Sequence, residues 1–420
     1  MLGRFTGLLG IAAILLAAWA MSTHRRQIKL RVVLWGLGLQ LGFALLVLET
    51  PVGDAFKSVS KGVVAMLSYA QVGSTFVFGD LLGAQDNSTK IRDAVDASHT
   101  MGPTIFAFQV LPIIIFIASF FAILYYLGVM QVIVKFFAIG MQKTMGASGA
   151  ESLNVAASLF MGQTEAPLTI RPFLAGLTES ELFTIMVSGM AHVSGAVMAA
   201  YVSFAHVKIE HLLTAVIMTA PATIMLAKMM HPEVGEPATA GKVDVKLDKT
   251  AVNIIDAAAQ GAGDGLHLCL NIAAMLIAFL ALIAMVDGIF GQIHSVLAWF
   301  PASMSNLFAI AFAPVAWLLG VPWKDAGAIG QLLGERLVTN EFIAFIDLGK
   351  IRSTLDNKSF TIATFALCGF ANFSSIAIQV GGIGALAPSR KSDLARLGMR
   401  AVMAGTMANF MSACIAGILQ

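Results

Sequence analysis

Two acidic residues stand inside apolar stretches of this 420-residue sequence. Glu165 lies in SLFMGQTEAPLTIRPFL, and Glu341 lies in GQLLGERLVTNEFIAFIDLGK. An ionisable side chain at membrane depth is costly unless it faces a cavity or a polar partner. One such carboxylate in each half of the chain predicts a polar site near the middle of a bilayer, where proteins built from inverted membrane repeats hold their ligands.

The composition indicates a polytopic membrane protein, because 58% of the residues are hydrophobic and only 12% are charged. No basic patch with interleaved aromatic residues is present, so nucleic-acid binding has no support. We interpret the first apolar run as an uncleaved helix, since its positive charges (HRRQIKLR) follow the run rather than precede it. The runs that approach the length of a membrane span are Phe5–Met21, Val32–Leu48, Thr104–Val129, Leu182–Phe204, Leu212–Met229, Leu266–Phe290, Phe360–Ile378 and Leu397–Leu419.

Positive charge in short loops sets the orientation of membrane helices. Three clusters of basic residues are expected in the cytoplasm. They are Arg25, Arg26, Lys29 and Arg31; Lys228, Lys242, Lys246 and Lys249; and Arg390, Lys391, Arg396 and Arg400. If eight segments cross the membrane, all three clusters lie in the cytoplasm and both termini are extracytoplasmic. This count holds only if the stretches around Glu165 and Glu341 do not cross the membrane. The threading therefore predicts that both stretches are re-entrant hairpins.

The sequence within both stretches agrees with hairpins. Gly162 and Pro167 interrupt the first one, while the second is expected to break at Gly334–Arg336 and again at Thr339–Glu341. Irregular backbone at membrane depth persists only where protein or a water-filled cavity satisfies it. The alternative is an ordinary amphipathic helix at the interface.

The two halves of the chain repeat the same order of segments: a long apolar run, an amphipathic piece, a hairpin, and two further helices. Polar residues interrupt the helix after each hairpin, at His192–Gly195 and at Asn372–Ser375. We predict an all-α fold of eight transmembrane helices and two re-entrant helical hairpins, arranged as an inverted repeat. The expected divisions are 1–100 for the N-terminal scaffold helices and the following extracytoplasmic segment, 101–230 for the first repeat with its hairpin near 150–176, 231–252 for a cytoplasmic linker, and 253–420 for the second repeat with its hairpin near 325–355.

Three motifs on these hairpins and on the second interrupted helix resemble the concentrative nucleoside transporters. They are GQTEAPLTIRPF (Gly162–Phe173), NEFIAF (Asn340–Phe345) and GFANFSSIAIQ (Gly369–Gln379), with a weaker fourth element at Phe76–Gly79. The resemblance implies a homotrimer in the bacterial inner membrane. It also implies an elevator-type mechanism, in which a transport domain slides against a trimeric scaffold. The protein would be a transporter with no cofactor besides a coupling cation.

Carried over to this sequence, the resemblance implies a nucleoside site. The first hairpin would read the nucleobase through Gln163, Thr164 and Glu165, with Gly162 allowing close backbone approach. The second hairpin and the interrupted helix would read the ribose through Glu341, Asn372 and Ser375. Val197, Phe370 and Leu268 would supply apolar walls.

The chemistry of these residue types suits such a ligand. A carboxylate has two acceptor oxygens and can take both vicinal hydroxyls of a ribose, while an amide offers donors and an acceptor to a base edge. Hydrogen bonds to an ionised group contribute about 1.5–3 kcal/mol each. Purine or pyrimidine preference is not fixed by these residues.

The resemblance also implies a coupling-ion region between the first hairpin and the following helix break. Sodium-coupled relatives use an asparagine and a serine with backbone carbonyls, whereas the matching positions here are Ser158 and His192, with Met161 and Val193 for the carbonyls. An imidazole removes one of the oxygen ligands that a hard cation prefers, and it repels sodium when protonated. We therefore expect proton coupling rather than sodium coupling, with Glu165 or Glu341 as a possible proton carrier. Sodium at this region remains the alternative.

Other interpretations remain open from the sequence. Asn372 and Ser375 are also typical of hydrogen bonds between packed helices, and the two glutamates could pair with Arg171 or Arg336. An intramembrane enzyme lacks support, because no His-Glu-x-x-His motif, serine–histidine pair or metal cluster is evident. A gate-type membrane protein that shares the hairpin without transporting nucleosides is the second rival.

Overall fold

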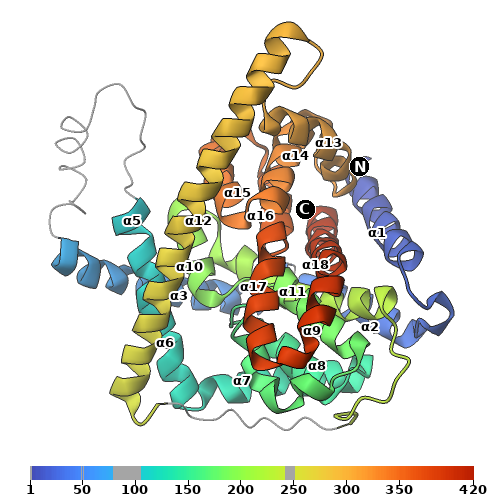
Figure 1. The fold of residues 1–420 in the computed structure, drawn as a ribbon, viewed down its shortest axis with the longest axis vertical. Helices are drawn as coiled ribbons and strands as arrows, with labels where there is room; N and C mark the ends of the chain where they lie inside the picture. The colour runs from blue at the N-terminus through green and yellow to red at the C-terminus, as the bar shows by residue number, and fades with distance from the viewer. Residues whose placement is uncertain (1, 49, 51, 79–105, 242–250) are drawn as a thin grey trace.

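The computed structural model describes residues 2–48, 50, 52–78, 106–241 and 251–420, and every regular element among them is a helix (Figure 1). A helix pairs its own backbone N–H and C=O groups, so an apolar helix can cross the core of a bilayer, where no water is available to those groups. Within the described residues, five helices are long and apolar enough to cross a bilayer, and up to seven if each of two bent helix pairs counts as one span. The chain is thus an all-α polytopic membrane protein, as the sequence predicts.

The N-terminal part consists of α1 (Leu2–Ala20), α2 (Leu30–Leu48) and α3 (Val52–Phe78). Helix α1 packs on α18 and α11, and α2 packs mainly on α11. These two helices therefore adjoin the body that holds the interrupted helices. The assignment of α1 and α2 to a scaffold stays a prediction, and their packing on α11 and α18 does not favour it. The extracytoplasmic segment expected after them falls largely on residues 79–105, outside the described residues.

Two series of helices follow, and they have the same order. The first series contains α5 (Phe106–Gln109), α6 (Leu111–Tyr126), α7 (Val129–Met145), α8 (Gly149–Ala157), η3 (Ala166–Gly176), α9 (Glu179–Ala191), α10 (Gly195–Ala205) and α11 (Ile209–Met230). The second series contains α12 (Ile254–Val296), α13 (Met304–Leu318), α14 (Trp323–Val338), α15 (Glu341–Lys350), α16 (Asn357–Leu367), α17 (Phe373–Leu386) and α18 (Lys391–Leu419). The eight runs expected to cross coincide with α1, α2, α6, α9–α10, α11, α12, α16–α17 and α18.

Each series contains one helical hairpin and one interrupted helix. The hairpins are α8–η3 and α14–α15, and they lie toward opposite ends of the molecule (Figure 1). The interrupted helices are α9–α10 and α16–α17. This arrangement confirms the predicted inverted repeat with two hairpins.

One prediction about the second hairpin is wrong, because one of its two expected interruptions is absent. Helix α14 runs without a break through Gly334–Arg336, and the second hairpin turns only at Thr339 and Asn340. Gly334 serves close packing instead, because a Cβ there would come within 2.3 Å of the Phe308 ring. Glu335, within the predicted break, is buried, and its Oε1 accepts a hydrogen bond from Gln331.

The helix pair α6–α12 forms a separate packing unit beside this body. Gly261 and Gly265 of α12 lie four residues apart on the contact face. A Cβ at Gly261 would meet Ala118 O at 2.7 Å, and one at Gly265 would meet Ile115 Cα at 2.7 Å. Small residues at this spacing let two membrane helices approach through their backbones.

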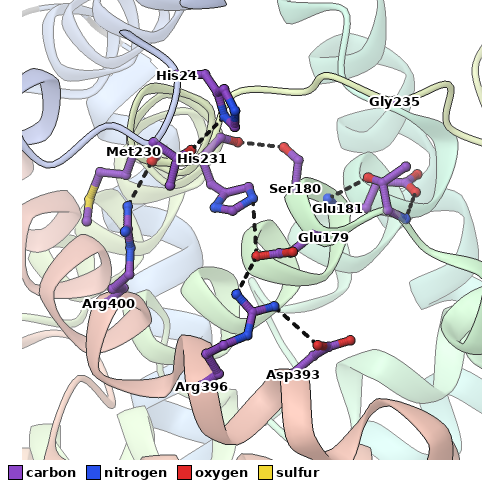
Figure 2. A network of polar contacts seen from close by, with 12 residues as sticks. His24, Glu179, Ser180, Glu181, Met230, His231, Gly235, Asp393, Arg396 and Arg400 are labelled. Atoms are coloured by element: carbon purple, nitrogen blue, oxygen red, sulfur yellow. Dashed lines mark hydrogen bonds and ion pairs between the residues drawn. The ribbon is translucent and has the colours of Figure 1, made fainter.

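Basic residues from all three clusters gather at the end where α8 and α9 begin. Arg400 donates to Met21 O and Met230 O, and Arg31 donates to Thr144 O. In Figure 2 the side chains of His231 and Arg396 both face the Glu179 carboxylate. His231 Nε2 lies 3.5 Å and Arg396 Nη1 lies 2.9 Å from Glu179 Oε1. Burial lowers the pKa of His231, although Glu179 opposes this effect. This convergence is what placement on one side of a membrane requires, while Lys242, Lys246 and Lys249 lie outside the described residues.

The two helix breaks are joined by buried polar side chains. Asn409 of α18 donates to Ala191 O, at the end of α9, and to Cys368 O, at the end of α16. Arg336 of α14 donates to Ala366 O, Gly369 O and Asn409 Oδ1. Phe370 N completes the link by donating to His192 O at 3.4 Å. Carbonyl groups freed by the two breaks thereby find donors inside the protein.

We predict that Asn409→Leu destabilises the protein. The substitution leaves two carbonyls and the Arg336 guanidinium without their partner, and each buried polar group so stranded costs about 1–3 kcal/mol. Thermal unfolding of the detergent-solubilised protein, followed by tryptophan fluorescence, should show a Tm lower by several degrees. Met411→Leu, a volume-conserving change two residues away that costs less than about 1.5 kcal/mol, is the control. Equal Tm values for the two variants would contradict the bridging role of Asn409.

Candidate functional site

Glu341 is the centre of a buried hydrogen-bonded group. It is the first residue of α15, after the N-cap Asn340, and it is only 5% exposed. The Tyr201 hydroxyl donates to its Oε1 at 2.9 Å, and Asn372 Nδ2 donates to its Oε2 at 3.2 Å. Among the described residues no ion pair joins Glu341 to an arginine. Both of its oxygens therefore interact with neutral donors, which leaves lone pairs for further donors.

Asn372 connects this carboxylate to the second interrupted helix. It is the N-cap of α17, and its Oδ1 accepts from Ser375 N at 2.9 Å and from Ser374 Oγ at 2.8 Å. The cap fixes the side chain, so the amide nitrogen has to point toward Glu341. The first interrupted helix resumes in a similar way at Ser194, the N-cap of α10.

The first hairpin contacts α17 of the second interrupted helix through Gln163. Its Nε2 donates to Ser375 Oγ at 3.1 Å, and its Oε1 accepts from Gln379 Nε2 at 3.3 Å. Gln379 is fully buried and also donates to Met186 O of α9. Gln163 of the predicted base set thus joins the residues predicted for the ribose in one network.

The rest of the first hairpin turn is more open. Glu165 is exposed in the described structure, and its Oε2 accepts from Gly162 N at 3.1 Å, which closes the turn. Tyr125 of α6 and Asp264 of α12 lie within electrostatic range of this carboxylate. Thr164 packs against Gly382 of α17, where a Cβ would come within 2.5 Å of its methyl group. The turn therefore lies between α17 and the α6–α12 pair.

The apolar residues of the predicted set lie on different elements. Val197 is buried in α10, and Phe370 is partly buried in the second break. Leu268 is partly buried on α12, beside Cys269, whose thiol donates to Leu111 O of α6. Gly195 at the start of α10 lies directly against Phe121 of α6.

The predicted coupling-ion residues are close to one another at the first break. Ser188 Oγ donates to Ser158 Oγ at 2.9 Å, and Ser158 Oγ donates to Asn154 O. His192 Nδ1 lies 2.9 Å from Ser188 O. A carbonyl only accepts, so Nδ1 carries the hydrogen and Nε2 holds a lone pair in the neutral ring. That buried Nε2 has no hydrogen-bond partner among the described residues.

Sequence reasoning missed three residues of this arrangement: Tyr201, Gln379 and Asn409. Tyr201 is fully buried in α10 and stacks on Phe345 of α15, with ring centroids 4.2 Å apart. Each of the three is a hydrogen-bonding residue inside an apolar helix, which is a signal of buried polar function. The sequence could not say which distant residue each of them would face.

Comparisons with known proteins cover nearly the whole chain. Three family models match: "Na+ dependent nucleoside transporter N-terminus" at residues 9–81, "Gate: Nucleoside recognition" at 107–208, and "Na+ dependent nucleoside transporter C-terminus" at 211–417. An uncharacterized transporter of Bacillus subtilis, YutK, is 44% identical over 98% of both chains. The chain belongs to the concentrative nucleoside transporter family.

Family members from animals and a solved structure extend this finding. The mouse solute carrier family 28 member 3 is 39% identical over 98% of this chain and 58% of its own length. CNTnw in an inward-facing substrate-bound state superposes with a TM-score of 0.91 at 38% identity, over 99% of this chain and 98% of that one. The membership excludes the enzyme interpretation.

We predict that Tyr201→Phe weakens the affinity for a nucleoside such as uridine about tenfold, or about 1.4 kcal/mol. Removal of the hydroxyl leaves Glu341 Oε1 without the donor that holds it, and a hydrogen bond to a charged group is worth about 1.5–3 kcal/mol. Isothermal titration calorimetry of the purified protein measures the change. Tyr69→Phe alters an exposed tyrosine on α3 and serves as the control. Unchanged affinity in Tyr201→Phe would refute this positioning role.

Proposed function

We propose that the protein takes up nucleosides across the bacterial inner membrane, driven by a cation gradient. The observation that carries this proposal is the network Tyr201–Glu341–Asn372–Ser375–Gln163, which joins both hairpins at one polar centre. Such a centre offers a carboxylate and amides together, which suits a neutral ligand with a diol at one end and a hydrogen-bonding ring at the other.

The second hairpin and α17 bind the ribose in this proposal. Glu341 already accepts from two neutral donors, and ribose hydroxyls would add donors to its remaining lone pairs. Gln163, Thr164 and Glu165 bind the base, with Gly162 at the turn and with Val197, Phe370 and Leu268 as apolar walls. Gln163 Nε2 donates to Ser375 Oγ, so a nucleoside that binds both side chains has to share or displace this hydrogen bond.

The proposed movement is that of an elevator within a homotrimer. The packing supports a division in which the α6–α12 pair belongs to the static scaffold and the hairpins move with α9, α10, α16 and α17. Glu165, Tyr125 and Asp264 would then lie at the sliding boundary, as would Gly195 against Phe121. The domain divisions given above are part of this proposal, with α1 and α2 as the open question.

Protons rather than sodium ions couple the transport in this proposal. Ser158 and His192 occupy the coupling-ion region, and the imidazole directs a nitrogen where a hydroxyl oxygen would suit sodium. Its unpartnered Nε2 is available to accept a proton. Family models and animal relatives carry sodium in their descriptions, so sodium coupling is the alternative to be tested.

A second candidate function is a gate-type protein that shares the hairpin but does not transport nucleosides. The match of residues 107–208 to a nucleoside-recognition gate model favours it for that segment alone. Counterflow of radiolabelled uridine in proteoliposomes separates the two functions. Exchange of unmodified uridine supports the transporter, and its absence in folded protein supports the gate.

We predict that Glu341→Gln abolishes uridine uptake while the protein remains folded. A glutamine has to direct an N–H donor toward Tyr201, Asn372 or the ribose, all of which present donors to the carboxylate. Glu335→Gln, on the same hairpin, changes another buried glutamate and should retain uptake. 3′-Deoxyuridine lacks one of the two hydroxyls that donate to Glu341 in this proposal, so it should bind at least tenfold more weakly than uridine, about 1.4 kcal/mol. Wild-type uptake by Glu341→Gln, or equal competition by the two nucleosides, would disprove the ribose assignment.

We predict that an inward proton gradient drives uridine accumulation in proteoliposomes, whereas an inward sodium gradient at equal pH does not. The double variant Ser158→Asn/His192→Ser restores the amide and hydroxyl oxygens of the sodium-coupled pattern, and it should gain sodium-driven uptake. Wild-type protein in the same lipids is the control. Sodium-driven accumulation by the wild type would show that the proton assignment is wrong.

A further inference from the structure

Helix α8 of the first hairpin carries a polar stripe. Glu151, Asn154 and Ser158 are spaced at i, i+3 and i+7, which places them on one face. Helix α9 has a matching stripe at i, i+3, i+7 and i+11, and its members are Glu181, Thr184, Ser188 and His192. All seven side chains are buried, with exposures of 2% or less.

The two stripes face each other along their length. At one end, Lys228 of α11 bridges the helices, because its Nζ lies 2.5 Å from Glu151 Oε1 and 2.8 Å from Ser180 Oγ. At the other end Ser188 meets Ser158 at 2.9 Å. The two contacts fix α8 and α9 as parallel neighbours. We refer to the seven residues of the two stripes as the α8–α9 seam.

The interior of the seam contains polar atoms that lack partners among the described residues. They are both amide atoms of Asn154 and the Nε2 atom of His192. Buried polar groups in proteins are otherwise almost always satisfied by protein or by ordered water. Fully buried atoms without partners therefore indicate that water or a bound ion interacts with them, since dry burial would be costly.

The end of the seam at Glu151 adjoins a surface pocket. A cavity of about 200 Å³ there is lined by two acidic residues, Glu151 and Glu233, and two basic ones, Lys29 and Lys228, among others. Lys228 forms ion pairs with Glu151 and Glu233, and Glu181 lies within electrostatic range of it. Figure 2 shows Glu181 beside Ser180 at the start of α9. Carboxylate oxygens are ligands that a hard cation prefers, so this end of the seam offers oxygens to a cation that enters from the pocket.

We propose that the α8–α9 seam is a hydrated pathway that carries the coupling cation between this pocket and the helix break at His192. Side-chain oxygens one helical turn apart provide successive ligands for a hard cation or a water chain for a proton. The inference rests on the cation coupling proposed above. It adds the route, which lies on the side that the basic clusters assign to the cytoplasm.

Cysteine accessibility tests the route directly. Asn154→Cys should react with an impermeant trimethylammonium methanethiosulfonate added to the pocket side, and the coupling cation should slow the reaction at least threefold. Val155→Cys, on the next and equally buried position of α8, should not react. The three native cysteines are buried, so they contribute little background. If Asn154→Cys is as inert as Val155→Cys, the seam is dry and the proposal fails.

Transport assays distinguish a failure of the proposed route from a failure of the proposed cation coupling. Thr184→Val removes a seam hydroxyl and should lower cation-driven uridine uptake at least fivefold, while uridine counterflow stays within twofold of the wild type. Thr223→Val is the matched control, because both threonines are fully buried and both donate to the carbonyl four residues before them at 2.9 Å. No cation-driven uptake by the wild type would overturn the coupling itself. Wild-type rates in Thr184→Val together with normal coupling would overturn only the seam.

Discussion

The structure depends on satisfying the backbone groups that two interrupted helices leave free at membrane depth. No water is available in the bilayer core, so these groups need donors from the protein itself. Asn409 reaches the carbonyls of both breaks, and Arg336 supplies the remaining donors. One amide on α18 thus holds two helix ends that lie far apart in the sequence. A buried guanidinium is costly, but Arg336 donates to three acceptors there, namely Ala366 O, Gly369 O and Asn409 Oδ1.

This bridge also explains why the polar residues converge. Each interrupted helix resumes at an N-cap, Ser194 in α10 and Asn372 in α17, and α15 begins just after the N-cap Asn340. Helix N-termini present unpaired N–H groups and a partial positive charge to the space between them. A carboxylate such as Glu341 is therefore stabilised at the start of α15. Neutral ligands with acceptor and donor groups gain from the same fixed dipoles.

Much of the fold could be predicted from the sequence, because composition and charge act over long segments. The order of helices, both hairpins and the two breaks follow from apolar runs and from polar residues within them. Local reasoning failed where packing decided the outcome: Gly334 looks like a helix breaker, yet it accommodates Phe308 inside a continuous α14. Glu335 lies in the same predicted break, yet it is buried within α14, where Gln331 donates to its Oε1. The site motifs indicated which residues carry chemistry, but that Tyr201 of α10 faces Glu341 and that Gln379 faces Gln163 needed three-dimensional contacts.

A physical link between ligand and cation follows from the position of Gln163. This residue lies on the hairpin whose first helix, α8, forms the seam, and its side chain contacts Ser375 of the ribose set. A ligand that displaces this contact pulls on the turn between α8 and η3, and Ser158 stands at the end of α8 just before that turn. Any cation held near Ser158 and His192 fixes the same turn from the other side. Binding energy can then pass between the two sites through one short rigid segment, which is the requirement for coupling.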